Sequence, residues 1–329
     1  MGKILRANDF VRRDVVSIRD FSRQEIDFIL KLARDIEERP ADYSGAMVGK
    51  IMAPLFFEPS TRTCGSFQMA MQQMGGAVFD FDVAQSSIKK GETLTDTARM
   101  FKGYKPDVVV IRHNKDGSAR LFADIVDFPV INAGDGKNQH PTQTLLDLYT
   151  IREILNRIDG ANVAVVGDLK YGRTTHSLAL ALSQYSDVSL SCVAPQGLEM
   201  PQNVIRDIRN KNVRVPERSL KDLEKVIREV DILYMTRIQR ERFPQGEEGE
   251  RQYARVCSEY RLTLEMIKRA GPKASFKVLH PLPKVDEIAI EVDGSEWAYY
   301  FKQAENGLYI RKALLYLLTG AKGRMRNHD

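Results

Sequence analysis

The chain has 329 residues, of which 43% are apolar and 28% charged, a composition typical of a globular protein rather than a disordered, collagen-like or low-complexity one. Its 49 Lys and Arg against 44 Asp and Glu leave a net charge of +5, a surplus too small and too dispersed to indicate a nucleic-acid partner. The length favours two domains, because a single hydrophobic core stops growing at about 250 to 300 residues.

Cellular context is constrained by what the chain lacks. No apolar run approaches the roughly 20 residues of a membrane-spanning helix, and the N-terminus carries no apolar secretion segment, so we expect a cytoplasmic protein without a membrane partner. Cys64, Cys192 and Cys257 are an odd, scattered set without metal-ligand spacing. Neither a disulfide framework nor a metal site is predicted, and the basic tail Lys322, Arg324, Arg326 is interpreted as solvated.

The first half of the chain predicts a parallel sheet covered by helices. Ser22 and Glu25 form a capping-box pattern that starts a helix, and short apolar runs then alternate with helical stretches. The predicted strands are Ile51–Phe57, Val78–Phe81, Val108–Ile111 and Val130–Asn132, with helices at Ser66–Met74, Thr95–Phe101 and Ala119–Ile125. Such alternation, with strands apolar on both faces, is typical of a sheet with helices on each side.

A long helix over Thr142–Asn156 leads to a second round of the same alternation. The predicted strands are Val163–Val166, Val188–Val193, Ile232–Met235 and Phe276–Leu279, with helices at Thr174–Tyr185, Pro201–Arg209, Leu220–Val230 and Leu262–Ala270. The charged segment Arg240–Tyr260 lacks strong periodicity and is predicted to be a mobile surface loop. The fold class is therefore α/β, with two doubly wound parallel-sheet domains, and we predict that the last helix, Gly307–Leu318, returns to the N-terminal domain.

Polar residues after the first strand predict an anion site, because open parallel sheets bind ligands beyond the carboxyl ends of their strands. Ser60, Thr61, Arg62 and Thr63 follow that strand and lead into a helix. Hydroxyls, a guanidinium and free backbone N–H groups at a helix start are what a phosphate needs. The alternative, that Ser60 is only an N-cap, explains one of the four donors, so the pattern favours an anion.

Later strand ends of the first half add two candidates. Arg112 and His113 end the third strand, and the fourth leads to His140, which stands before a helix with Gln143 one turn on. The positive end of a helix dipole favours a neutral imidazole, which can donate a hydrogen bond to a polarised carbonyl oxygen. Taken alone, Arg112 is more typical of a surface charge and His140 of a structural histidine.

The second half offers a near-match to a phosphate loop and two arginines. Gly167–Thr174 follows a strand, but Arg173 stands where a P-loop has its lysine, so nucleotide binding is a weak alternative. Arg237 follows the strand Ile232–Met235. Two guanidiniums at one rim suit a dicarboxylate, although each alone is more typical of the surface. Lys90, in a polar segment of the first half, is the cation that would close over an anion if that segment folds over one.

Together these motifs resemble the catalytic chains of the aspartate carbamoyltransferase family, and the resemblance covers essentially the whole chain. Ser60-Thr61-Arg62-Thr63 is similar to the family's carbamoyl phosphate signature, and His140-Pro141-Thr142-Gln143 to its second motif. Gly167–Arg173, Thr236–Gln239 and His280–Pro283 are similar to further family segments in the same order and spacing.

The resemblance implies transfer of the carbamoyl group of carbamoyl phosphate to the amine of L-aspartate, an early step of pyrimidine biosynthesis, without cofactor or metal. It implies a carbamoyl phosphate domain at residues 1–145 with the helix at about 307–329, and an aspartate domain at residues 146–306. The implied carbamoyl phosphate residues are Ser60, Thr61, Arg62, Thr63, Ser86, Arg112, His140, Gln143, Pro281 and Leu282, and the implied aspartate residues are Lys90, Arg173, Arg237 and Gln239. Within these sets, the implied catalytic residues are Arg62, Thr63, Lys90, Arg112 and His140.

The resemblance also implies a homotrimer in which Ser86 and Lys90 reach a neighbouring subunit's site, and it leaves a regulatory chain or larger assembly open. Aspartate is expected over ornithine, because Pro281 stands where ornithine enzymes carry Cys and their Ser-Met-Gly segment is absent. Cys64 departs from the Arg frequent in the family and is expected to change packing, not chemistry. The alternatives are a carbamoyltransferase for ornithine or another amino acid, a P-loop-like nucleotide-binding protein and a non-catalytic homologue.

Overall fold

A computed structural model of the chain describes residues 4–81, 91–211, 213–216, 220–238 and 245–321. The chain divides into two compact units, Met1–Leu146 with Glu305–Asp329, and Asp147–Ala304. Each unit contains a four-stranded sheet in which every pairing is parallel. The predicted α/β fold class with two doubly wound sheets is therefore confirmed.

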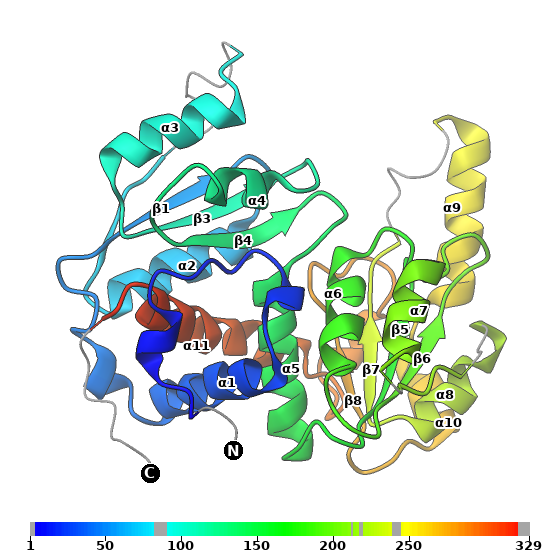
Figure 1. The fold of residues 1–329 in the computed structure, drawn as a ribbon. Helices are drawn as coiled ribbons and strands as arrows, with labels where there is room; N and C mark the ends of the chain where they lie inside the picture. Colours follow the sequence, from blue (N-terminus) through cyan, green and yellow to red (C-terminus); the bar gives the residue numbers. More distant parts are fainter. Residues whose placement is uncertain (1–3, 82–90, 212, 217–219, 239–244, 322–329) are drawn as a thin grey trace. The chain divides into compact units, whose positions relative to one another are not determined.

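The sheet of the first unit has the strand order β2-β1-β3-β4. Its strands are β1 (Ile51–Phe56), β2 (Ala77–Val78), β3 (Val108–His113) and β4 (Val130–Asp135), and its helices include α1 (Arg23–Glu38), α2 (Thr61–Gln73), α3 (Leu94–Tyr104) and α4 (Ser118–Ala123). Helices α3 and α4 cover one face, while α1 and α2 lie on the other side (Figure 1). The chain runs outward from β1 to β2 and then returns to β3, so the switch in strand order lies between β1 and β3.

Local sequence explains the first helix and the place of the last one. The Ser22 hydroxyl accepts from the N–H of Glu25 at 3.3 Å, and the Glu25 carboxylate accepts from the N–H of Ser22 at 2.8 Å, as the capping box predicts. Helix α11 (Tyr300–Leu318) ends against the first unit, where the Tyr316 ring packs edge-on to Tyr43 at 5.4 Å. The predicted return of this helix to the N-terminal domain is confirmed (Figure 1).

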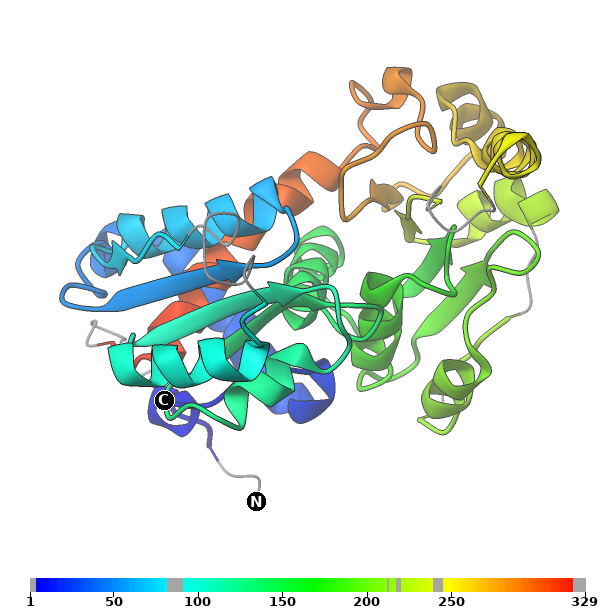
Figure 2. The ribbon, with the colours of Figure 1, turned by 90° about the horizontal axis from the view of Figure 1, so that it is seen from above.

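The sheet of the second unit repeats the same order as β6-β5-β7-β8. Its strands are β5 (Asn162–Val166), β6 (Ser189–Val193), β7 (Ile232–Met235) and β8 (Lys277–Leu279). Its helices include α6 (Arg173–Leu182), α7 (Gln202–Arg209), α8 (Leu223–Glu229), α9 (Glu247–Tyr260) and α10 (Leu264–Ala270), and α5 (Pro141–Leu155) leads into it along the chain. Helices α8, α9 and α10 share one core with the strands, and α6 and α7 lie on the other side of the sheet (Figure 2).

The structure corrects several element boundaries, and α11 begins at Tyr300 rather than at Gly307. The loop predicted over Arg240–Tyr260 is wrong from Glu247 onward, where α9 forms and places Tyr253, Val256 and Tyr260 on the core. Helix α2 begins at Thr61 rather than Ser66, and β2 is limited to Ala77–Val78. Among the described residues, no helix is both long enough and apolar enough to span a membrane.

Candidate active site

The corner between β1 and α2 presents the first group of candidate residues. Ser60 is the N-cap residue, and Thr61, Arg62 and Thr63 form the first turn, whose N–H groups have no intrahelical acceptors. In the part of the chain that the structure describes, the Ser60 side chain makes no capping hydrogen bond. Partial burial lowers the pKa of the Arg62 guanidinium, because desolvation disfavours a positive charge, and a bound anion would compensate for that cost. The corner thus has the donors that a phosphate requires.

Arg112 lies at the same edge of the sheet, paired in register with Phe56 of β1. Its Nη1 donates to the carbonyl of Ala133 at 3.2 Å, and its Nε lies 3.4 Å from a carboxylate oxygen of Glu58. The side chain is only 17% exposed. Contacts to the ends of β1 and β4 therefore fix the guanidinium at the switch point of the first sheet.

His140 and Gln143 sit at the start of α5, as the sequence predicts, and both are buried. Thr142 Oγ1 lies 3.4 Å from Nδ1 of His140, and the N–H of Gln143 donates to the His140 carbonyl at 3.0 Å. The first contact holds the imidazole and the second holds the backbone of His140 at the N-terminal end of the helix. An imidazole and an amide of this kind suit a carbonyl oxygen and a carbamoyl amide.

Asp135 is a buried positioning residue that the sequence analysis did not identify. One carboxylate oxygen accepts from Asn132 Nδ2 at 2.8 Å and from the N–H of Gln139 at 3.1 Å, and the other accepts from the N–H of Gly117 at 2.8 Å. The carboxylate therefore fixes the loop that leads from β4 to His140. Its place between two glycines was the available signal, but its partners are up to 18 residues away in the chain.

His113, the neighbour of Arg112, has a structural role instead. Its ring packs at 4.8 Å from that of Phe57, and its Nδ1 accepts from the N–H of Lys115 at 3.0 Å. Burial lowers the pKa of His113, so the neutral ring is favoured.

In the first turns of α2, burial raises the pKa of the Cys64 thiol, which favours the uncharged form of that side chain.

The second unit places two arginines after neighbouring strands. Arg173 is the first residue of α6, beyond β5, and Arg237 follows β7 by two residues. Val166 and Met235 are paired in register, so both strands end at the same edge, and the switch in strand order falls between them. Both guanidiniums are partly buried. Their placement is what the binding of a dicarboxylate by two forked donors needs.

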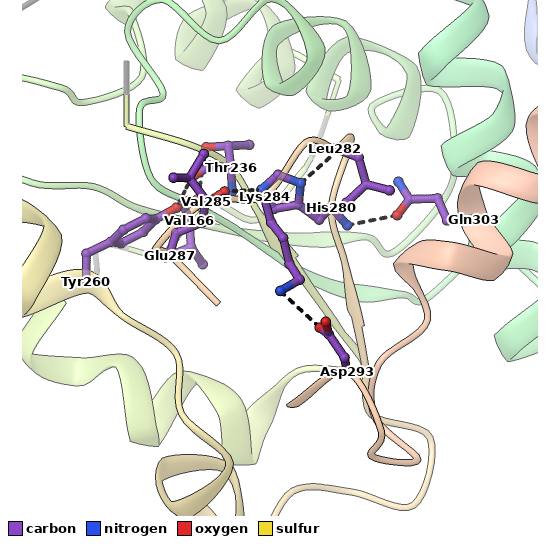
Figure 3. Close-up of polar contacts among 10 residues, drawn as sticks. All are labelled: Val166, Thr236, Tyr260, His280, Leu282, Lys284, Val285, Glu287, Asp293 and Gln303. Carbon is purple, nitrogen blue, oxygen red and sulfur yellow. Dashed lines mark hydrogen bonds and ion pairs between the residues drawn. The ribbon is translucent and has the colours of Figure 1, made fainter. Parts of the chain in front are cut away.

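The Tyr260 hydroxyl connects the starts of the two loops that carry Arg173 and Arg237. Its hydroxyl lies 2.7 Å from the Val166 carbonyl and also contacts the carbonyl of Thr236, joining the ends of β5 and β7 (Figure 3). Gly167 has φ +126°, and a Cβ there would stand 2.1 Å from that hydroxyl. Sequence analysis assigned Tyr260 to a loop and missed this role, because the contact joins residues 94 positions apart.

Pro281 and Leu282 follow β8, the next strand of the second sheet. Leu282 has φ +51°, and its N–H donates to His280 Nδ1 at 2.8 Å (Figure 3). Ser86, Lys90 and Gln239, the remaining residues of the predicted site, lie outside the described residues. Within residues 4–81 and the other described ranges, no group of three His, Cys, Asp or Glu side chains could hold a metal ion.

Two doubly wound α/β units that gather guanidinium, hydroxyl and amide donors at the carboxyl ends of their strands define a class of protein that binds small anions. Residues 13–153 match the family model described as "Aspartate/ornithine carbamoyltransferase, carbamoyl-P binding domain", and residues 159–318 match its "Asp/Orn binding domain". The chain therefore belongs to the aspartate/ornithine carbamoyltransferase family.

Individual relatives lie in the aspartate branch of this family. The "Aspartate carbamoyltransferase catalytic subunit" of Thermococcus kodakarensis is 51% identical over 321 residues, which cover 96% of this chain and 99% of the relative. The solved catalytic subunit of M. Jannaschii aspartate transcarbamoylase is 45% identical with a TM-score of 0.83, covering 92% of this chain and 97% of that one. The Trypanosoma cruzi aspartate transcarbamoylase, solved with carbamoyl phosphate and aspartate, is 35% identical with a TM-score of 0.86, covering 94% and 96%.

Proposed function

We propose that this chain transfers the carbamoyl group of carbamoyl phosphate to the amine of L-aspartate, giving N-carbamoyl-L-aspartate and phosphate, in pyrimidine biosynthesis. The observation that carries the proposal is the placement of Arg173 and Arg237 after two neighbouring strands, in a chain that also carries the Ser60–Thr63 corner. The first unit binds carbamoyl phosphate and the second binds aspartate, a division that the descriptions of the two matching family models support.

In the first unit, Ser60, Thr61, Arg62 and Thr63 bind the phosphate, and Arg112, His140 and Thr63 bind the carbonyl oxygen. Gln143 and the carbonyls of Pro281 and Leu282 accept from the carbamoyl amide. Arg173, Arg237 and Gln239 bind the two carboxylates of aspartate, and Lys90 and Ser86 complete the site. The partly buried guanidinium of Arg112, held by contacts to Ala133 and Glu58, supports its role, since donors fixed before the reaction stabilise developing charge best.

The chemistry needs no covalent intermediate. The aspartate amine attacks the carbonyl carbon of an activated acyl phosphate, the C–N bond forms, the C–O bond to the phosphate breaks, and the proton lost by the amine passes to the leaving phosphate. Negative charge builds up first on the carbonyl oxygen and then on the leaving phosphate, so Arg112 and Arg62 lower the barrier electrostatically. Two anionic substrates are brought together, which explains why several cations are required.

We also propose that the active protein is a cytoplasmic homotrimer with active sites shared between subunits, Ser86 and Lys90 coming from a neighbour. The name of the relatives, catalytic subunit, supports a further regulatory partner. The exposed apolar side chains of Ile51, Phe79 and Tyr104 on the first unit support an assembly surface. Neither a cofactor nor a metal takes part in the proposed reaction.

The test is turnover by the purified chain with carbamoyl phosphate and either L-aspartate or L-ornithine, measured as released phosphate and as ureido product. We expect product with aspartate and none with ornithine. Arg237→Ala should raise the KM for aspartate by at least about tenfold, since a bidentate charged contact is lost. Turnover with ornithine alone would contradict the aspartate assignment, and no turnover with either amino acid would contradict the proposed activity.

A further inference from the structure

A buried histidine and glutamate lie at the two ends of the loop that follows β8. His280 is 2% exposed and Glu287 is 5% exposed, and His280 Nε2 lies 2.7 Å from Glu287 Oε1 (Figure 3). Neither belongs to the residues proposed to touch substrate. Between them run Pro281 and Leu282, whose carbonyls are proposed to accept hydrogen bonds from the carbamoyl amide.

The hydrogen bonds define which nitrogen of His280 carries the proton. The N–H of Leu282 donates to Nδ1 at 2.8 Å, so Nδ1 must offer its lone pair and Nε2 must carry the proton that is donated to Glu287. The other oxygen of Glu287 accepts from the N–H of Val285 at 3.1 Å. Each member of the pair therefore binds one backbone N–H of the loop and is bound to the other member.

The loop is anchored to the rest of the second unit through the same histidine. The backbone N–H of His280 donates to the Gln303 side chain at 2.8 Å, and that side chain donates to Asp147 at 2.7 Å. Asp147 also accepts from the Tyr234 hydroxyl at 2.9 Å. The side chains of this network are all buried: His280, Gln303, Asp147 and Tyr234. The position of His280 is therefore fixed by a connected set of buried hydrogen bonds.

The backbone conformation of Leu282 depends on its contact with His280. Its φ of +51° is a conformation that residues other than glycine rarely adopt, and it persists only where surrounding contacts determine it. The Leu282 N–H bond to Nδ1 supplies such a contact. Because this N–H shares its peptide plane with the Pro281 carbonyl, the bond fixes the direction of that carbonyl and constrains the residue that carries the second one.

We propose that His280 and Glu287 are positioning residues that determine the selectivity of this chain for a carbamoyl over an acetyl group. They orient the carbonyls of Pro281 and Leu282 toward the N–H groups of the substrate amide, which an acetyl group replaces by a methyl group that cannot donate. A site built to bind an N–H group rejects an analogue that lacks it, because its acceptors are left unpaired. The inference rests on the proposed function and adds its selectivity.

The test compares kcat/KM for carbamoyl phosphate with that for acetyl phosphate, at saturating L-aspartate, by phosphate release against an enzyme-free blank. Two variants of His280 separate its contacts. In His280→Asn the amide oxygen takes the place of Nδ1 and still accepts from Leu282, whereas in His280→Gln the amide reaches the place of Nε2 and that acceptor is lost. A general loss of packing would affect both variants and both substrates alike.

We expect the parent chain to prefer carbamoyl phosphate strongly. His280→Gln should lower its kcat/KM for carbamoyl phosphate by about 10- to 100-fold and that for acetyl phosphate by less than about threefold, since only the amide contacts are lost. His280→Asn should keep the parent's ratio within about threefold, because the bond to Leu282 remains. Glu287→Gln retains the volume, but its amide has one acceptor for two donors. When that acceptor binds the Val285 N–H, the amide nitrogen faces His280 Nε2, the ring proton moves to Nδ1 and the acceptor for Leu282 is lost, so the ratio should shift in the same direction as for His280→Gln.

Ser183→Ala is the matched control, because it removes a buried side-chain hydrogen bond, to the Leu180 carbonyl at 2.7 Å, in the same unit but outside the loop that follows β8. Its ratio should equal that of the parent. Equal losses for both substrates in His280→Gln, or an unchanged ratio in both His280→Gln and Glu287→Gln, would overturn the inference while leaving the proposed function intact. A parent chain without aspartate-dependent turnover would instead overturn the proposed function and this inference with it.

Discussion

Arg112 illustrates how one residue depends on three strands. Its backbone pairs with β1, its Nη1 bonds to a carbonyl of β4, and its Nε faces Glu58, which follows β1. A guanidinium is suited to this position, because its planar fork can satisfy protein acceptors and still direct N–H groups at a substrate oxygen. A lysine ammonium has one nitrogen and cannot do both.

We therefore predict that Arg112→Lys retains the fold but lowers kcat/KM for carbamoyl phosphate by about 10²- to 10³-fold, the usual loss for one oriented donor at a developing oxyanion. Steady-state kinetics with aspartate measures the loss. Arg120→Lys is the control, since Arg120 forms an exposed ion pair with Asp20. A decrease of less than about threefold in Arg112→Lys would contradict the assigned role.

At the level of single residues, the local sequence predicts candidate site residues but not the residues that hold them in position. Ser60, Arg112 and His140 are predicted as site residues because they follow predicted strands, a pattern visible within a few positions. Asp135, Tyr260 and the pair His280 and Glu287 were missed as positioning residues. Their polar partners lie on other elements or depend on a loop conformation, and neither can be inferred from spacing along one chain.

The elements themselves were predicted well where periodicity was strong. The strands of both sheets were located because central parallel strands are apolar on both faces. Helix α9 was missed because its many Glu and Arg residues obscure an apolar stripe of only Tyr253, Val256, Cys257 and Tyr260. That spacing of three, one and three residues is helical, and the tertiary core supplies the stability that the charged sequence does not indicate.

Asp231 joins the amino-terminal ends of three strands of the second sheet. Its carboxylate accepts from the N–H of Asn162 at 3.1 Å, from Lys273 at 3.1 Å and from the Ser275 hydroxyl at 2.9 Å. Burial alone would raise the pKa of Asp231, but these hydrogen bonds and the Lys273 charge hold it below the usual value. The charged form is therefore bound more strongly in the folded than in the unfolded state.

The sign of the pH dependence follows from that lowered pKa. The stabilisation is fully present above the unfolded pKa of about 4 and is lost as the pH falls through the lower, folded pKa. Asp231→Asn should therefore lower the free energy of unfolding by about 1 to 3 kcal/mol at pH 7, with the difference from the parent shrinking in acid. Trp297, the sole tryptophan, packs on the core of this unit and reports urea unfolding by fluorescence.

Glu265→Gln serves as the control for Asp231→Asn, because the Glu265 side chain is 87% exposed in the same unit. It should change the unfolding free energy by less than about 0.5 kcal/mol at either pH. A destabilisation of Asp231→Asn that is the same at pH 7 and at pH 3 would show that shape, rather than charge, is what the carboxylate contributes.

The turn after β5 leaves no room for a side chain at Gly167. A Cβ there would lie 2.1 Å from the Tyr260 hydroxyl and 2.5 Å from the Thr236 carbonyl, at a φ of +126°. We predict that Gly167→Ala costs more than about 3 kcal/mol in unfolding free energy, since backbone strain and steric overlap add. It should also raise the KM for aspartate, because the same turn carries Arg173.

Gly160→Ala separates backbone strain from steric overlap. Gly160 also has a positive φ, +71°, but an added Cβ there would meet no atom within 4 Å. Strain alone should cost about 1 to 2 kcal/mol there and leave the KM unchanged. Urea unfolding followed by Trp297 fluorescence measures both variants. Equal destabilisation of the two would contradict the close approach of Tyr260 as the reason for glycine.

On the scale of the whole molecule, the exposed apolar side chains of the first unit support assembly. Ile51 is 45% exposed, Phe79 43% and Tyr104 62%, and the rings of Phe79 and Tyr104 lie 6.3 Å apart. Clustered apolar groups of this kind mark surfaces that contact other proteins. They lie at the β2 edge of the sheet, where a neighbouring subunit would also cover the strand edge.

Shared active sites predict recovery of activity when two inactive chains are mixed. Lys90→Ala and His140→Ala chains should each be inactive, but a mixed trimer can place an intact His140 beside an intact Lys90 from its neighbour. In a random mixture of equal amounts, about a quarter of the sites regain both residues, because each of the two adjoining chains has an even chance of being the required one. Activity after joint refolding, compared with equal amounts of each variant refolded alone, measures this fraction.

Mixing Arg112→Ala with His140→Ala is the control, since both residues belong to the same unit of one chain and no site regains both. Mixed trimers separated by a charge tag that show no activity would contradict sharing and place Lys90 in the site of its own chain.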